Sequence, residues 1–321
     1  MANEDKQPNP PEEDLELYQD EAEDTEESAG VGTNEQRVAL PGGEAMTSEE
    51  VNRFLLGREA SFVTIVGDKD SGKSTIVCAI YDRLLRGPYA NLAFAQSRTL
   101  MALERRSHYS RIESGRAVPD TPRTSILEGL HYFHLGLVMG DNDRVDLLIS
   151  DRAGEVYRDA RGDSSLIETL PELPQADRLI LLIDGRRAAN PLERASALQA
   201  VRQSLRAFLD GGALGTNSVV QVVTTKMDLI SGSADEVATT AALSEFEHRL
   251  NRDFSNRVAE LSFRKIAARD PVGNLAPAFG LDAMLVEWVT KKPRASTFSV
   301  SPPTLCSEFD KLLARTPTGG A

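Results

Sequence analysis

The sequence predicts an α/β fold in three layers, in which helices cover both faces of a doubly wound, mostly parallel sheet. Short apolar runs of strand length alternate with longer runs whose apolar residues recur at helical spacing. A glycine-containing loop joins the first of these strands to the first long helix. Polar residues follow several of the later strands. Alternating strands and helices build parallel sheets, and polar residues at strand ends are typical of their ligand sites.

The individual elements follow from these runs. Strands are expected over 61–66, 130–138, 145–150, 178–183, 218–224 and 259–267. Helices are expected to start near Thr47 and over 74–85, 191–210, 235–256 and 281–290. Segment 91–124 interrupts the alternation and is expected to insert a strand over 91–97 and a helix over 98–112. It holds six arginines against three acidic residues, which makes it the most basic stretch of the chain.

Three segments are expected along the chain. Residues 1–45 form an acidic tail, 46–291 the folded domain with its insertion, and 292–321 a mobile Pro- and Ser-rich tail in which 305–313 has helical spacing. Residues 1–30 hold twelve acidic residues and one basic residue, so most of the formal net charge of −13 belongs to the tail. The tail either solvates the protein or acts as an acidic arm that docks on a basic partner or on the protein itself.

Composition excludes several classes of protein. Two cysteines are too few for a disulfide framework or a thiolate metal cluster. The apolar runs are far shorter than a membrane span, and the acidic start is unlike a signal peptide. There is no basic excess that would favour nucleic acid. These features predict a cytoplasmic protein without a membrane span or a nucleic-acid partner.

The strongest motif is G-x-x-x-x-G-K-[ST] at 67–74. It comprises Gly67, Asp68, Lys69, Asp70, Ser71, Gly72, Lys73 and Ser74, with Thr75 following. The glycines allow successive N–H groups to surround phosphate oxygens, and the helix N-terminus adds a positive dipole end. Lys73 can reach the β- and γ-phosphates, and the Ser74 hydroxyl can bind Mg²⁺. The motif therefore predicts a nucleotide phosphate site.

Two further elements are expected on the phosphate side. Asp151 ends a strand and can hold a Mg²⁺-bound water, while the N–H of Gly154 can contact a γ-phosphate. Thr124 precedes the second strand and can complete the Mg²⁺ shell while a γ-phosphate is present, which would make its loop a switch. Thr121 and Ser125 are rival candidates for this hydroxyl.

The base site is predicted at two later strand ends. In Thr225-Lys226-Met227-Asp228, the Asp228 carboxylate can accept two N–H bonds from the N1 and N2 edge of guanine, and the Lys226 stem can cover the base. Adenine lacks that pair of donors, so Asp228 would select GTP. A backbone N–H from the run Ala267, Ala268 and Arg269 can bond guanine O6.

With these elements in this order, the sequence resembles the Ras-like P-loop GTPases over roughly 62–290. The run 94–124 is more narrowly similar to the bacterial double-GTPase domains of the second type, which belong to multi-gene effector or conflict systems. The resemblance implies a doubly wound sheet with one antiparallel edge strand, GTP and Mg²⁺ as ligands, slow hydrolysis to GDP and phosphate, and a protein partner for a nucleotide-dependent switch. It makes Lys73, Thr124, Gly154 and Glu155 the catalytic set, and Ser74, Thr124 and Asp151 the metal set.

One departure from the family affects hydrolysis. The family commonly has Gln after D-x-x-G to orient the attacking water, and Glu155 stands there. A carboxylate near a γ-phosphate is repelled unless a cation or proton intervenes. A scaffold that binds GTP without hydrolysing it is therefore an alternative. An ATP-using P-loop protein is a further alternative, against which the TKMD sequence argues.

Other residues have simpler expectations. Arg123 and Arg152 are candidates for stabilising transition-state charge, although either is more often a surface arginine. His131 and His134 are expected on opposite faces of a strand and not in a metal site. Cys78 is expected to be a small buried hydrophobe.

Overall fold

The computed structural model describes residues 42–110, 129–140, 143–271 and 273–290. These residues belong to one compact unit, Pro41–Ala321. Both predicted tails, apart from 42–45, and the segment 111–128 with Thr121, Arg123, Thr124 and Ser125 lie outside the described residues.

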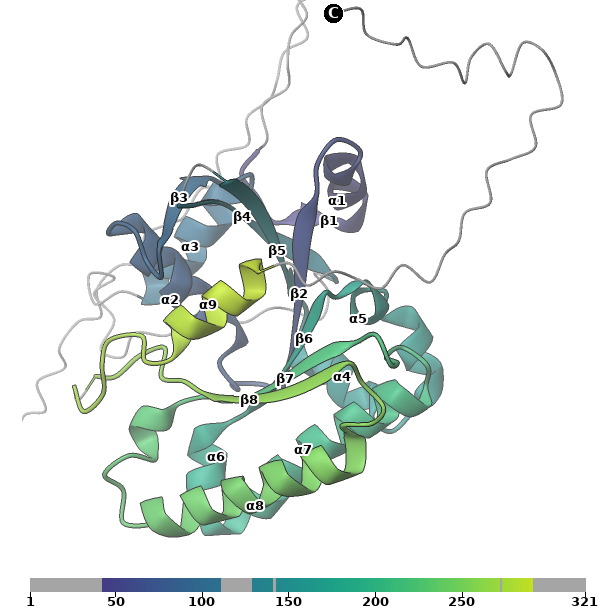
Figure 1. The fold of residues 1–321 in the computed structure, drawn as a ribbon, viewed down its shortest axis with the longest axis vertical. Helices are drawn as coiled ribbons and strands as arrows, with labels where there is room; N and C mark the ends of the chain where they lie inside the picture. The colour runs from purple at the N-terminus through teal and green to yellow at the C-terminus, as the bar shows by residue number, and fades with distance from the viewer. Residues whose placement is uncertain (1–41, 111–128, 141–142, 272, 291–321) are drawn as a thin grey trace, which may run out of the picture. The chain divides into compact units, whose positions relative to one another are not determined.

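The described residues form one eight-stranded sheet. Its strands are β1 (Met46–Thr47), β2 (Ala60–Val66), β3 (Leu92–Gln96), β4 (His131–Met139), β5 (Asp143–Asp151), β6 (Arg178–Ile183), β7 (Val219–Thr224) and β8 (Glu260–Lys265). Strands β5-β2-β6-β7-β8 lie side by side and are parallel, as Figure 1 shows. The six main predicted strands and the inserted strand are confirmed, and the short β1 was not predicted.

The antiparallel edge of the sheet is larger than the resemblance implied. Strand β4 runs antiparallel to β5, and β1 and β3 both pair antiparallel with the far side of β4. The described part of the insertion therefore extends the sheet through β3.

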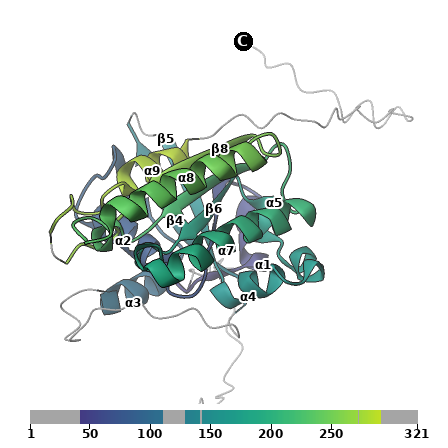
Figure 2. The ribbon, with the colours of Figure 1, turned by 90° about the horizontal axis from the view of Figure 1, so that it is seen from below.

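Helices cover both faces of the sheet. They are α1 (Ser48–Leu55), α2 (Lys73–Leu85), α3 (Leu100–Ser110), α4 (Gly154–Ala160), α5 (Glu172–Gln175), α6 (Gly185–Ala189), α7 (Pro191–Asp210), α8 (Glu236–Phe254) and α9 (Leu281–Val289). One core joins α2, α3 and α9 to the sheet, and a second joins α4, α5, α7 and α8 to it. Figure 2 shows α9 and α7 on opposite sides of the strands. The three-layer, doubly wound fold is confirmed.

Local sequence explains where several helices start. Thr47 and Glu50 form a reciprocal capping box at α1, in which the Thr47 N–H donates to Glu50 over 2.8 Å. Asn190 caps α7 by accepting from the Leu192 N–H, with Pro191 in the first turn. Strand β6 is buried along its whole length, as expected of a central parallel strand.

The inserted helix α3 packs on α2. Leu103 is fully buried, and the Tyr81 hydroxyl donates to Glu104 over 2.5 Å. Cys78, as expected, is buried. The described part of the insertion is thus an integral layer of the fold.

Among the residues that the structure describes, no helix combines the length and apolarity needed to cross a bilayer.

Candidate functional site

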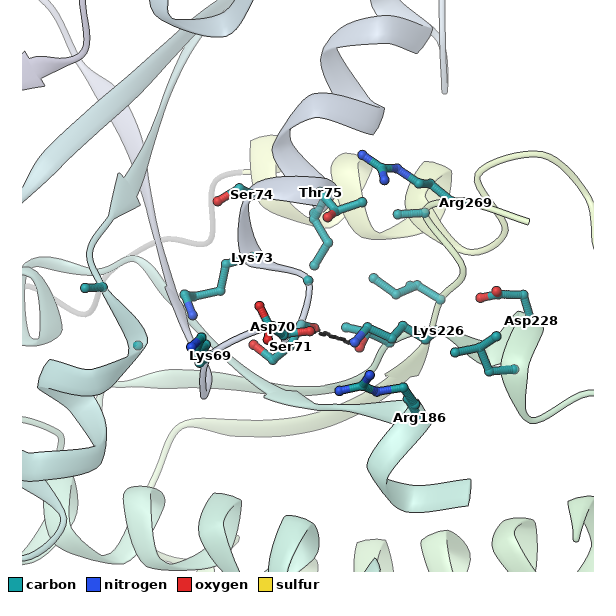
Figure 3. A pocket seen from close by; sticks show the side chains of 18 of the residues that line it. Lys69, Asp70, Ser71, Lys73, Ser74, Thr75, Arg186, Lys226, Asp228 and Arg269 are labelled. Carbon is teal, nitrogen blue, oxygen red and sulfur yellow. Dashed lines mark hydrogen bonds between the residues drawn. The ribbon is translucent and has the colours of Figure 1, made fainter. Parts of the chain in front are cut away.

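The loops that follow the parallel strands converge on one pocket at their carboxyl ends. It encloses about 430 Å³. Its walls are residues 69–76, 153–155, 225–226 and 228–229, with Arg186, Ile266, Ala268 and Arg269. Strand β2 lies between β5 and β6 in the sheet, and the loops that form the pocket come from both sides of β2. Parallel sheets bind ligands at such a switch point in the strand order. Figure 3 shows Lys73 and Ser74 toward one side of the pocket and Asp228 toward the other.

The loop at 67–74 has the geometry expected of a phosphate cradle. Gly72 adopts a φ of 100° immediately before α2, so the N-terminus of that helix opens into the pocket. The Lys73 ammonium donates to the carbonyl oxygens of Gly67 (2.8 Å) and Asp68 (3.0 Å). Burial lowers the pKa of Lys73, and the nearby Asp151 opposes that shift. The positive charge of Lys73 is thus held against the loop at 67–74.

Close packing requires a glycine at position 154, shortly after the strand that ends at Asp151. A Cβ at this position would lie 2.5 Å from the Gly67 carbonyl oxygen and 2.8 Å from the Lys73 Nζ. The chain at 153–155 therefore passes directly against the phosphate loop, and Glu155 lines the same pocket.

Asp68 does not present its side chain to the pocket. Its carboxylate is paired with Arg161 (2.9 Å) and Arg187 (3.1 Å), and it lines two other clefts beside the pocket. A contact from Asp68 to phosphate would therefore use only its backbone N–H.

The base side is joined to the phosphate loop by side-chain hydrogen bonds. The Thr225 hydroxyl donates to the Ser71 carbonyl oxygen over 2.9 Å. Lys226 donates to the Asp70 carbonyl oxygen over 2.6 Å and pairs with Asp184 over 3.0 Å, and the first of these contacts is drawn in Figure 3. Lys226 has a φ of 53°, so a short turn brings it back over the pocket.

Asp228 and the run 267–269 complete the base side. Asp228 is half-buried, and burial raises the pKa of its carboxyl group. The Ala267 N–H already donates to the Phe279 carbonyl oxygen over 3.0 Å. Ala268 and Arg269 do line the pocket and remain the candidates for donating to guanine O6.

The two described members of the predicted metal set lie around a single cation. The Arg106 guanidinium, from α3, lies 2.7 Å from Asp151 Oδ2 and donates to Ser74 Oγ over 3.4 Å. A hydroxyl and a carboxylate that converge on one positive group are hard oxygen donors, which suit Mg²⁺. Within the described ranges no group of three His, Cys, Asp or Glu side chains could hold a metal by itself. A bound Mg²⁺ would therefore need phosphate and water oxygens as well, as nucleotide sites provide.

Arg152 is not placed to stabilise phosphate charge. Its Nε lies 2.7 Å from Oε1 of Glu172, a buried carboxylate that also accepts from the Tyr157 hydroxyl over 3.0 Å. Burial raises the pKa of Glu172, and Arg152 opposes that shift. The pair fixes the start of the 152–160 segment to α5, which is a structural role.

Three pocket-side residues were missed by the sequence reasoning. Asp184 pairs with Lys226, Arg186 lines the pocket, and Arg106 reaches the metal set. Asp184 and Arg186 directly follow the predicted strand 178–183, so the strand-end rule could have found them. Nothing in the sequence near Arg106 marks it, because its position depends on how α3 packs.

The comparisons with known proteins agree with this architecture. The profile of a family described as Double-GTPase 2 matches residues 61–289. No curated protein matches the chain significantly.

Three solved structures resemble the chain at low sequence identity. The signal recognition particle receptor SRb-GTP/SRX complex from Chaetomium thermophilum matches with a TM-score of 0.40 and 12% identity, over 72% of this chain and 97% of that chain. The GTP-bound Ski7 GTPase-like domain of S. cerevisiae matches with a TM-score of 0.40 and 16% identity, over 74% of this chain and 51% of that chain, so only about half of its length is matched. The mammalian SRP receptor matches with a TM-score of 0.38 and 15% identity, over 71% and 99%. The family match, and not these likenesses, supports the assignment.

Proposed function

This chain belongs to the Double-GTPase 2 family of GTP-binding proteins, and from that premise we propose that it hydrolyses GTP to GDP and phosphate as a nucleotide-dependent switch. We further propose that it acts in the cytoplasm, within a bacterial effector or conflict system, through a protein partner. The observation that carries the proposal is the convergence of a phosphate loop and a guanine-type carboxylate on one pocket.

The residues divide the work of binding as follows. Backbone N–H groups of 68–75 would hold the β-phosphate, and Lys73 would bind the β- and γ-phosphates. Asp228 would accept the N1 and N2 protons of guanine, and Lys226 would cover the face of the base. The contacts from Thr225 and Lys226 to the phosphate loop support this arrangement, because they fix the position of the base side relative to the phosphate loop.

Hydrolysis would proceed by in-line attack of water on the γ-phosphorus. Lys73 would take up negative charge that develops on the phosphoryl oxygens, and the Gly154 N–H would contact the γ-phosphate. Ser74 and Asp151 would hold Mg²⁺, which supplies charge neutralisation between the β- and γ-oxygens. Thr124, outside the described residues, is proposed to complete the same shell.

Glu155 supports partner dependence. Its carboxylate lines the pocket next to Gly154, where a neutral amide would orient water in related proteins. Its charge would be repelled by the γ-phosphate, so isolated turnover is expected to be slow until a partner adds a cation. The same observation favours the second candidate function, a GTP-dependent scaffold without turnover.

Two measurements on the purified full chain test the proposal. Fluorescent GDP should bind, and unlabelled GTP should displace it at far lower concentration than ATP does. Multiple-turnover phosphate release should be slow but above the rate of the Lys73→Ala variant. Displacement by ATP as effective as by GTP would contradict the guanine site, and GTP binding without any release would favour the scaffold.

A further inference from the structure

Arg106 joins the inserted helix to the metal side of the pocket. Its guanidinium contacts both described members of the predicted metal set, at 2.7 Å from Asp151 Oδ2 and 3.4 Å from Ser74 Oγ. Its side chain is only 15% exposed, and that of Asp151 is 5% exposed. A buried carboxylate is costly without a cation, so Arg106 supplies charge that Asp151 requires.

Packing determines where Arg106 lies. Leu103 and Ser107, on either side of it in α3, are fully buried, and Glu104 accepts from the Tyr81 hydroxyl of α2. The guanidinium itself lies over the Phe133 ring of β4, 5.1 Å from the ring centre. Arg106 is therefore held by α2 on one side and β4 on the other, unlike a solvated surface arginine.

Mg²⁺ would require the Ser74 hydroxyl as a ligand and the Asp151 carboxylate as the acceptor of a Mg²⁺-bound water. Because Mg²⁺ keeps a nearly octahedral shell of oxygens and usually several waters, its shell would occupy the space between Ser74 and Asp151 where the guanidinium lies. Lys73 is committed to the carbonyl oxygens of Gly67 and Asp68. The group that must leave Ser74 and Asp151 is thus Arg106.

We propose that Arg106 competes with Mg²⁺ for Ser74 and Asp151, and so sets the Mg²⁺ concentration at which the nucleotide complex forms. Displacement of its guanidinium by the metal changes the anchoring of α3. The insertion thereby senses metal occupancy. This inference rests on the proposed function, because the metal is taken to bind with a guanine nucleotide.

The opposite role makes the opposite prediction. An Arg106 that stayed in place and bound phosphate together with Mg²⁺ would strengthen metal binding. Its removal would then raise the Mg²⁺ requirement, whereas removal of a competitor lowers it.

The test measures the apparent dissociation constant of Mg²⁺ for the protein–GDP complex. Affinity for a fluorescent GDP is determined in EDTA and across a Mg²⁺ titration, for wild type, Arg106→Gln and the control Arg105→Gln. Arg105 is the neighbouring residue of α3, and it is 62% exposed and paired with Glu44 over 2.7 Å. The control therefore removes an arginine and an ion pair from the same helix without touching the metal set.

We expect Arg106→Gln to lower the Mg²⁺ dissociation constant about three- to tenfold, and Arg105→Gln to change it less than about twofold. Arg106→Lys keeps the positive charge but lacks the planar fork of guanidinium donors, and it should fall between wild type and Arg106→Gln. It also serves as the test variant if thermal melting shows Arg106→Gln to be unfolded.

Each outcome decides the matter. An unchanged or higher Mg²⁺ dissociation constant in folded Arg106→Gln overturns the competition and leaves the proposed function standing. Wild type that binds no guanine nucleotide at any Mg²⁺ concentration contradicts the proposed function, and the competition falls with it.

Discussion

The two ends of the pocket are held in different ways. On the base side, Thr225 and Lys226 follow a central strand and donate directly to carbonyl oxygens of the phosphate loop, over 2.9 and 2.6 Å. On the metal side, Ser74 and Asp151 are bridged by a guanidinium from α3, a helix of the insertion. The base side is thus built by adjoining strand ends, and the metal side depends on an added layer.

This difference predicts different responses to ligand. Contacts between neighbouring loops of one sheet need not break when a nucleotide enters, so the base side is pre-organised. The contact of Arg106 with Asp151 uses the carboxylate that the proposed Mg²⁺ shell would need, so it must change. An insertion can thus add control over metal binding to a pocket without altering how that pocket recognises the base.

The largest expected effect comes from Lys73→Ala, because Lys73 would bind both the β- and γ-phosphates. Removing one partner of a buried charge pair costs about 2–5 kcal/mol, so affinity for GDP and GTP should fall at least about 30-fold. The fold should survive, since the hydrogen bonds that Lys73 Nζ makes within the described residues go to two carbonyl oxygens of a loop.

Equilibrium binding of fluorescent GDP measures the effect, with Lys69→Ala as the control. Lys69 lines the same pocket but its proposed contact uses the backbone N–H, so its loss should cost less than about tenfold in affinity. Wild-type affinity in Lys73→Ala would exclude the phosphate-site assignment.

Asp228→Asn tests the base side alone. Two hydrogen bonds to a charged group are at stake, so GTP affinity should fall about 100-fold while xanthosine triphosphate gains. Xanthine carries a C2 carbonyl where guanine has an amino group, and an amide donor fits it better. Competition binding with both nucleotides supplies the ratio.

The metal dependence of Asp228→Asn tests whether the two ends of the pocket act independently. Because Asp228 and Ser74 lie toward opposite sides of the pocket (Figure 3), the Mg²⁺ dissociation constant of the variant with bound xanthosine nucleotide should equal that of wild type with GDP within about twofold. A large change would show that the two ends are coupled.

The sequence predicts those parts of the site whose structure is specified by residues next to one another in the chain. The strand 61–66 and the loop 67–74 are specified by an apolar run and glycine spacing, and both occur as expected. In the run 267–269, by contrast, the Ala267 N–H is taken by a bridge to Phe279, twelve residues away. Such a bridge has no signal in the tripeptide itself.

Arg106 shows the same limit over a longer distance. Its approach to Asp151 follows from the register in which α3 packs on α2, where Leu103 is buried and Glu104 meets Tyr81. The sequence predicted the helix and its basic character, but not which arginine would point inward. The contrast between the two ends of the pocket is therefore also a contrast in predictability.

Glu155→Gln is expected to change the metal side in a way that affects rate more than affinity. Replacing a carboxylate near the γ-phosphate by an amide removes repulsion and provides a group that can orient water. Turnover should rise about tenfold, which equals ~1.4 kcal/mol of barrier, while GDP affinity stays within about threefold. Multiple-turnover phosphate release measures it, and a fall in rate would assign Glu155 a positive role in catalysis.

The smallest expected effect concerns His134, which ties β4 to the segment before α3 and to β5. His134 lies on β4 beside Phe133, and its ring is fully buried. Its Nδ1 accepts from the Arg98 N–H over 3.0 Å, so Nε2 carries the proton and donates to Asp146 over 2.9 Å. Burial lowers the pKa of His134, and the hydrogen bond to Asp146 only partly opposes it, while Arg98 and Arg58 add to the lowering.

The sign of the pH effect follows from this lowered pKa. The unfolded chain takes up the His134 proton at a higher pH than the folded chain does. Stability from His134 is therefore present above the unfolded pKa of about 6.5 and is lost as pH falls toward the folded value. One proton changes the free energy of unfolding by at most about 1.4 kcal/mol per pH unit. Urea unfolding at pH 7, 6 and 5 should show a shallower slope against pH for His134→Gln than for wild type, and parallel slopes would mean that His134 titrates alike in both states. Because His134 lies on the strand that carries Phe133 under Arg106, acid should weaken the metal-side edge while base selectivity for GTP over xanthosine triphosphate stays unchanged.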